Sequence, residues 1–179
     1  MTWKLEDAEA IPFSREHIAV VIGIPSSRVN NWIDRNRLWQ ADRGRKFHRP
    51  YSFKEVVELG GFAAMRVARI PEKACARFVY TYGFHRAFLR APQEVRLSFR
   101  NGRWDVGVYD PDAVVTLLIN MRAVGTHLFE RLALELLRHP TDWPRGAFES
   151  FRLLYRDCVR HGRLDPGSVP QFEIRTSGR

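Results

Sequence analysis

The stretch from Gly23 to Phe53 most constrains what this chain can fold into, because a tight turn leads there into a short helix and then into a basic loop. A Gly-Ile-Pro turn comes first, and Ser26 or Ser27 can then cap a helix N-terminus. The apolar residues that follow recur at helical spacing, at Val29, Trp32 and Ile33. This spacing predicts a helix over residues 23–37 with one buried face.

The opposite face of this predicted helix is polar. It carries Ser27, Asn31, Asp34 and Arg35, with Arg28 and Asn30 on its flanks. Asn can form two hydrogen bonds with adenine, Arg can form two with guanine, and Ser fits either base. A short helix of this kind suits the major groove of double-stranded DNA. The residues expected to contact DNA from this helix are Ser26, Ser27, Arg28, Asn30, Asn31 and Arg35.

The polar loop over residues 41–50 is too basic to be core and is suited to phosphates. Between Arg28 and Lys54 there are eight Lys or Arg residues against two acids, Asp34 and Asp42. Five residues are expected to hold phosphates or to reach the neighbouring minor groove: Arg43, Arg45, Lys46, His48 and Arg49.

The segment from Phe13 to about Phe78 resembles the winged helix-turn-helix of the MerR family of bacterial regulators. The matching parts are, in chain order, a first helix at 13–19, a turn at Gly23-Ile24, a second helix with Val29 and Trp32, a wing at 45–53, a helix at 55–59, and a further turn with Ile70-Pro71, Ala74 and Phe78. The resemblance implies a DNA-binding fold over under half of the chain. No family resemblance is found beyond about Leu89.

The chain departs from the family pattern at three positions. Asn30 stands where the family usually has Arg, so the phosphate contact that this Arg makes in the family does not carry over directly to this chain. Ile33 stands where the family has an acid. Asn36 stands where the family has Gly, and Asn is expected to take the left-handed backbone that the turn needs.

The composition favours a polyanionic partner. At 179 residues, with 45% hydrophobic residues, the chain is long enough for one medium domain or two small ones with a proper core. Its net charge is +9 and its pI is near 10.2. Basicity alone could reflect a solvated Arg-rich surface, but its clustering on one motif favours nucleic acid. There is no long apolar run and no signal-peptide pattern, so a cytoplasmic protein without membrane contact is expected.

No pattern for catalysis or cofactor binding is present. The chain has no Walker A, GxGxxG or GxSxG motif. Cys75 and Cys158 stand far apart, and the six histidines form no metal-ligand pair. Asp157 and His161 have helical spacing typical of a surface pair. We therefore expect no enzyme activity, no cofactor and no metal site, and the sequence leaves any small-molecule ligand unknown.

The rest of the N-terminal half predicts four further helix features. Ser14 is expected to cap the first helix, and Ser52 with Glu55 forms a capping box for the next. Gly60-Gly61 inside that helix marks either a close helix crossing or a break. Pro71 is expected to start another helix.

A change of pattern at Ala91-Pro92 marks the predicted domain boundary. Asn101-Gly102 lies between two alternating runs and predicts a β-hairpin with a type I′ turn. The expected cross-strand pairs are Phe99 with Trp104, Leu97 with Val106, and Val95 with Val108. The other face carries Arg96, Arg100 and Arg103, either as an ordinary solvated face or as a second phosphate contact.

Asp110-Pro111-Asp112 has the residue order of a helix start. The predicted helix runs from there to about Arg138 and carries more apolar surface than one face needs. This surplus is either an internal core or a homodimer seam over residues 111–137, and we expect the seam. A last amphipathic helix is expected over Phe148–Val159.

Together these features predict a mainly α fold with a small β component. Residues 1–90 would form the winged helix-turn-helix, and residues 91–179 an α+β module with one hairpin and long helices, for dimerisation or partner binding. The expected function is sequence-specific binding of double-stranded DNA by a bacterial or phage transcription regulator. The alternatives are an architectural protein of the phage packaging or excisionase type, and a protein-interaction adaptor that does not read DNA.

Overall fold

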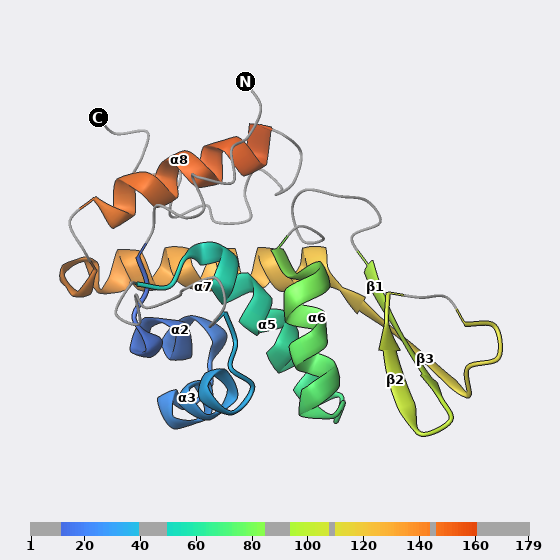
Figure 1. Cartoon of the computed structure of the whole chain (residues 1–179). Helices are drawn as coiled ribbons and strands as arrows, with labels where there is room; N and C mark the ends of the chain where they lie inside the picture. Colours follow the sequence, from blue (N-terminus) through green and yellow to red (C-terminus); the bar gives the residue numbers. More distant parts are fainter. Residues whose placement is uncertain (1–11, 40–49, 85–93, 108–109, 144–145, 161–179) are drawn as a thin grey trace.

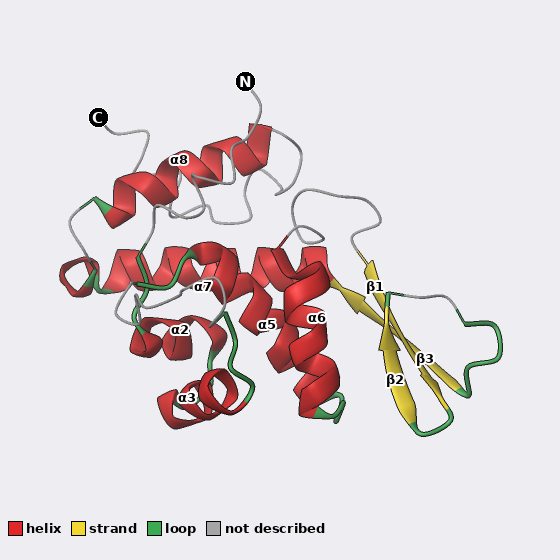
Figure 2. Ribbon diagram, viewed as in Figure 1, coloured by secondary structure: helices red, strands yellow, loops and turns green. Residues whose placement is uncertain are grey.

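The computed structural model describes residues 12–39, 50–84, 94–107, 110–143 and 146–160. It is mainly helical with a small three-stranded antiparallel sheet, as expected of a mainly α fold with a small β component (Figures 1 and 2). The elements in chain order are α2 (Arg15–Ile22), α3 (Ser26–Arg35), α5 (Phe53–Val67), α6 (Glu72–Phe84), β1 (Glu94–Arg100), β2 (Arg103–Val106), β3 (Val115–Asn120), α7 (Met121–Arg138), the short 3-10 helix η2 (Pro140–Asp142) and α8 (Ala147–Arg160).

Helices α2 and α3 form a pair joined by a short turn. Ser14 caps α2 as predicted, because its side chain accepts a hydrogen bond from the backbone nitrogen of His17. Gly23 takes a left-handed backbone with φ +79° and ends the helix. In Figure 1 the helix pair lies at one corner of the molecule, with α3 outermost.

The predicted cap of α3 was wrong. The flanking residue is Pro25, which has no side-chain cap hydrogen bond, and Ser26 and Ser27 lie inside the first turn. Pro25 is held at φ −59° with an extended ψ of 140°, so its carbonyl accepts the first helical hydrogen bonds, from Arg28 and Val29.

The predicted left-handed Asn36 was also wrong. Asn36 has φ −93°, and its side-chain nitrogen donates to the Trp32 carbonyl at 2.9 Å, which holds it close to helical geometry. Arg37 takes the left-handed backbone instead, with φ 51°.

Helix α5 is the central helix of the N-terminal half. Its capping box forms as predicted, with Ser52 and Glu55 satisfying each other's backbone nitrogens. The helix passes through Gly60 and Gly61 unbroken, and both glycines lie at close crossings. A Cβ at Gly60 would meet Leu128 of α7, and a Cβ at Gly61 would meet the ring of Phe78 on α6. Helix α6 follows Pro71 as predicted.

The hairpin forms in the predicted register. Phe99 pairs with Trp104 and Leu97 with Val106. Asn101 and Gly102 have φ values of 49° and 76°, as a type I′ turn requires. The predicted partner of Val95, Val108, lies outside the described residues.

The helix predicted to begin at Asp110 was wrong. Asp110 accepts a hydrogen bond from the backbone nitrogen of Asp112 at 2.9 Å, so the acid-Pro-acid run forms a turn. The chain then enters β3, which pairs antiparallel with β1 and makes β1 the central strand. The helix begins only at Met121, where the Asn120 side chain accepts from the Ala123 nitrogen at 3.0 Å.

Helix α7 packs against helices from both halves of the chain and so joins them into one core. The Phe129 ring lies 5.0 Å from that of Phe53 on α5 and 4.7 Å from that of Phe151 on α8. In Figure 1 α7 runs through the middle, with α8 on one side and α2, α3 and α5 on the other. The predicted domain boundary at residue 91 lies outside the described residues, but the described parts on its two sides share this core.

Candidate nucleic-acid interface

The inner side of α3 is buried. Val29, Trp32 and Ile33 have exposed fractions of 0%, 7% and 5%. The Trp32 ring lies 5.0 Å from the Phe62 ring on α5. These three residues therefore fix which side of the helix faces solvent, and the assignment of Trp32 to the core is confirmed.

The outer side of α3 presents an exposed polar row. Ser27, Asn31 and Arg35 lie one helical turn apart in succession, and all three are exposed. Ser26 and Arg28, in the first turn, are also exposed. Helix α3 thus brings five of its six predicted contact residues to the surface.

The sixth residue, Asn30, is half-buried and turned toward α2. Its Oδ1 atom accepts a hydrogen bond from Arg15 at 3.2 Å. The same guanidinium binds Asp34 through two hydrogen bonds, at 3.0 Å and 2.8 Å. Asn30 therefore helps to set the angle between the two helices.

Arg15 joins α2, α3 and the segment that precedes α5. Its Nε donates to the Tyr51 hydroxyl at 3.1 Å. The hydrogen bond to Asp34 raises the pKa of Arg15 above its ordinary value, and the Tyr51 hydroxyl adds to the shift. Tyr51 in turn exchanges two backbone hydrogen bonds with Phe13, each of 2.8 Å. Arg15 also compensates the one acid on the outer side of α3.

The turn between α2 and α3 is held from the C-terminal half. Arg131 of α7 donates to the Val20 carbonyl at 2.8 Å. Its guanidinium occupies the space that a side chain at position 23 would need, so a substitution there would displace Arg131, and the left-handed backbone favours glycine in any case.

All five predicted phosphate-binding residues, Arg43, Arg45, Lys46, His48 and Arg49, lie outside the described residues. The chain on either side of them is anchored. Trp39 is 3% exposed, and its ring nitrogen donates to Glu58 on α5 at 2.8 Å. The rings of Trp39 and Tyr51 pack edge to face at 5.9 Å. Trp39 and Tyr51, described residues on the two sides of this segment, therefore pack against each other and belong to the core.

The arginine face of the sheet is partly neutralised. Arg100 lies 3.4 Å from Asp110 and 3.3 Å from Asp112. Arg77 of α6 lies 3.9 Å from Asp105 on β2. These pairs favour an ordinary solvated face over a second phosphate contact at Arg100.

The described part of the chain also bears on metal sites, membrane spans and reactive thiols. No group of three or more His, Cys, Asp or Glu side chains there could hold a metal ion. None of the described helices combines the length and apolarity needed to cross a membrane. Cys75 is fully buried, and burial raises the pKa of its thiol to about 12. The side chain of Cys158 and the predicted pair Asp157 and His161 lie outside what the structure describes.

Sequence reasoning missed Arg15 and Arg131, the two arginines that position the helix pair. Arg15 was expected only as part of the first helix, and its partner Asp34 lies 19 residues away. Arg131 reaches across 111 residues to Val20. No local pattern marks such long-range partners, although an acid on a face otherwise suited to DNA was an indirect sign that a cation lies nearby.

The relation of this helix pair to known proteins rests on the sequence resemblance alone. No protein-family model, no curated protein and no solved structure matches the chain.

Proposed function

We propose that the protein binds double-stranded DNA in a sequence-specific way through α3 and acts as a transcription regulator. The observation that carries this proposal is the exposed row of Ser27, Asn31 and Arg35 on a helix whose other side is buried. A row of this chemistry on a peripheral helix, backed by a fixed core, is what direct readout of the major groove requires.

Each residue of the row has a role in the proposal. Arg35 would bind a guanine through two hydrogen bonds, and Asn31 an adenine in the same way. Ser26 and Ser27 lie in the first turn, where side chains and backbone nitrogens can meet a phosphate at the helix N-terminus. Asp34 does not repel the DNA strongly, because Arg15 already neutralises it.

Non-specific affinity would come from the basic segment 40–49. Each phosphate that a cation no longer neutralises should reduce the dependence of log K on log salt by about one unit. Replacing Arg45 and Lys46 with Ala should therefore weaken binding to all DNA alike and flatten the salt dependence by about two units. An unchanged slope would remove both residues from the interface.

The decisive experiment is a selection from random duplex oligonucleotides with the full chain. The proposal predicts enrichment of a defined sequence. Arg35→Ala should relax the preference at one base pair, at a cost of about 1–3 kcal/mol. Arg156→Ala removes the same charge from an exposed position on α8, which lies on the opposite side of α7 from α3 (Figure 1), and is the matched control. Binding without any preference would favour an architectural protein, and no binding would favour an adaptor.

We further propose that the protein acts as a homodimer whose interface lies within residues 111–137. A single recognition helix makes few base contacts and so gives limited specificity. A dimer commonly overcomes this by placing two such helices on half-sites about one helical turn of DNA apart. Exposed apolar side chains cluster at the start of this segment, with Val114, Val115 and Leu118 exposed at 79%, 42% and 54%. Since α7 is largely internal, these residues on and beside β3 are the available seam.

A further inference from the structure

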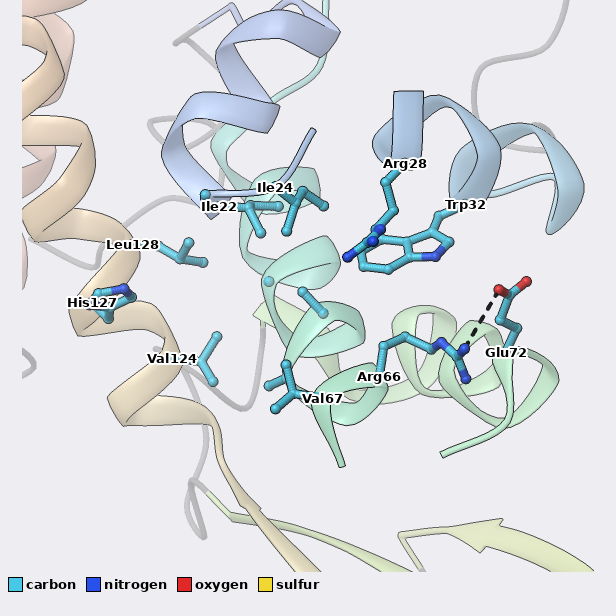
Figure 3. A pocket seen from close by; sticks show the side chains of 14 residues that line it. Ile22, Ile24, Arg28, Trp32, Arg66, Val67, Glu72, Val124, His127 and Leu128 are labelled. Carbon is cyan, nitrogen blue, oxygen red and sulfur yellow. Dashed lines mark ion pairs between the residues drawn. The ribbon is translucent and has the colours of Figure 1, made fainter. Parts of the chain in front are cut away.

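A cavity of about 680 Å³ lies between the helix pair and the C-terminal half. Its walls come from the turn between α2 and α3, from α3 itself, from α5 and from α7. Figure 3 shows Arg28 and Trp32 of α3 on one side and Val124, His127 and Leu128 of α7 on the other. This volume is within the range of pockets that hold small organic ligands.

The cavity exists because α5 has small residues where it faces this space. Gly60, Ala63 and Ala64 are spaced so that they share one face of the helix, and all three line the cavity. Larger side chains surround them, namely Ile22, Ile24, Val67, Val124 and Leu128. The result is a largely apolar pocket that the side chains of the described residues leave unfilled.

The charges of the cavity are unbalanced. Arg66 already has partners, since it donates a hydrogen bond to the Ile70 carbonyl and lies 4.0 Å from Glu72. Glu72 is the one acid among the described residues of the lining. Arg28 and His127 have no hydrogen bond or ion pair with any of the described residues. Among the described residues, therefore, no acid compensates the Arg28 guanidinium, which lies at the edge of an apolar space.

We propose that this cavity binds a small amphipathic anion, with its apolar body against α5 and α7 and its carboxylate or sulfonate on Arg28. A planar guanidinium matches such a head group through paired hydrogen bonds. An apolar wall beside the charge strengthens the attraction relative to open water. This inference does not depend on the proposed DNA binding, although it gives a ligand to Arg28, which is also one of the residues expected to contact DNA; probe binding is measured without DNA and so tests the cavity alone.

Two fluorescent probes of nearly the same shape test the site on the full chain. Anilinonaphthalene sulfonate has an apolar body with an anionic group, and N-phenylnaphthylamine is its uncharged counterpart. We expect the sulfonate to bind one per chain. Arg28→Gln should weaken sulfonate binding at least about tenfold, as expected when a charge-assisted hydrogen bond is removed. The same variant should change binding of the uncharged probe by less than about twofold.

Matched variants separate this site from other surfaces. Val124→Phe should fill the cavity from α7 and abolish binding of both probes. Val114→Phe adds the same bulk at an exposed position away from the cavity and should leave binding intact. Arg138→Gln controls for the loss of one positive charge. Near-ultraviolet circular dichroism confirms that every variant is folded. The proposal is overturned by a folded wild-type chain that binds neither probe, by sulfonate binding that ignores Arg28→Gln, or by probe binding that survives Val124→Phe.

Discussion

Trp32 is the residue on which the orientation of α3 depends. Its indole is buried against Phe62 and also lines the cavity. Trp32→Ala should lower the free energy of unfolding by about 3–5 kcal/mol, because a large ring is removed and the space cannot close. Urea denaturation measures this. Arg35→Ala, exposed on the same helix, should cost no more than about 0.5 kcal/mol. A Trp32→Ala protein of unchanged stability that loses only DNA affinity would show that the helix faces are reversed.

Cys75 gives a prediction about pH. It is buried, its thiol donates to the Ile70 carbonyl, and burial raises its pKa from 9.0 to about 12. The unfolded chain therefore releases this proton at lower pH than the folded chain does. The stabilisation is fully present below pH 9 and is lost as the pH rises from 9.0 toward about 12.

This prediction is tested by comparing the wild-type protein with the Cys75→Ala variant. Unfolding midpoints of both proteins, measured across that pH window, should converge as the pH rises, because only the wild type has the buried thiol. Parallel curves would show that the thiol is not held in its neutral form by the fold.

At the scale of residues, the spacing of apolar residues along the sequence predicted which side chains are buried. It did not predict which polar side chains form hydrogen bonds with each other. The apolar face of α3 follows from the helical period alone. The interpretation of Asn30 as a freely available DNA contact could not foresee Arg15, because that hydrogen bond depends on how two helices cross. The same holds for the arginine at position 131.

At the scale of elements, the two glycines of α5 make the packing between helices testable. Gly61→Ala gains up to about 1 kcal/mol of helix propensity. The added Cβ would lie 2.5 Å from a ring carbon of Phe78, which is fully buried. Overpacking of this kind costs about 1–3 kcal/mol, so we expect a net loss of stability.

A double-mutant cycle with Phe78→Leu tests the cause. Removing the ring makes room for the methyl group, so Gly61→Ala should be less harmful, or even stabilising, in that background. Equal effects of Gly61→Ala in both backgrounds would exclude the contact with Phe78 as the reason.

The sheet shows which elements local sequence can predict. Asn101-Gly102 fixes the turn type and hence the register of β1 with β2. Strand β3 was missed because Asp110-Pro111-Asp112 matches a helix start. The sequence does alternate there, with Val115, Leu117 and Ile119 on one face of the strand. The other face is partly apolar as well, however, so the same stretch fits a buried helix as well as a strand. Pairing with β1, a contact across the chain, decides the outcome.

At the scale of the whole molecule, the proposed dimer is testable by one substitution. Leu118→Lys places a charge on the exposed part of β3 and should convert a micromolar dimer into a monomer, as measured by sedimentation velocity. Leu153→Lys makes the same change on α8, where Leu153 is 55% exposed, and should leave the dimer intact. A wild-type monomer at this concentration would contradict the seam.

The hydrogen bond from Arg131 to Val20 also has a consequence for synthesis of the protein. The turn of the helix pair is completed by a residue made 111 positions later. Phe129, whose ring packs edge to face against that of Phe53, also belongs to α7 and is made late. At about 5–20 residues per second, the ribosome needs about 3–11 seconds to reach Met121, the start of α7, from Val67, the end of α5. During that interval the N-terminal half leaves an apolar face uncovered, which makes the nascent chain a substrate for chaperones that bind such faces.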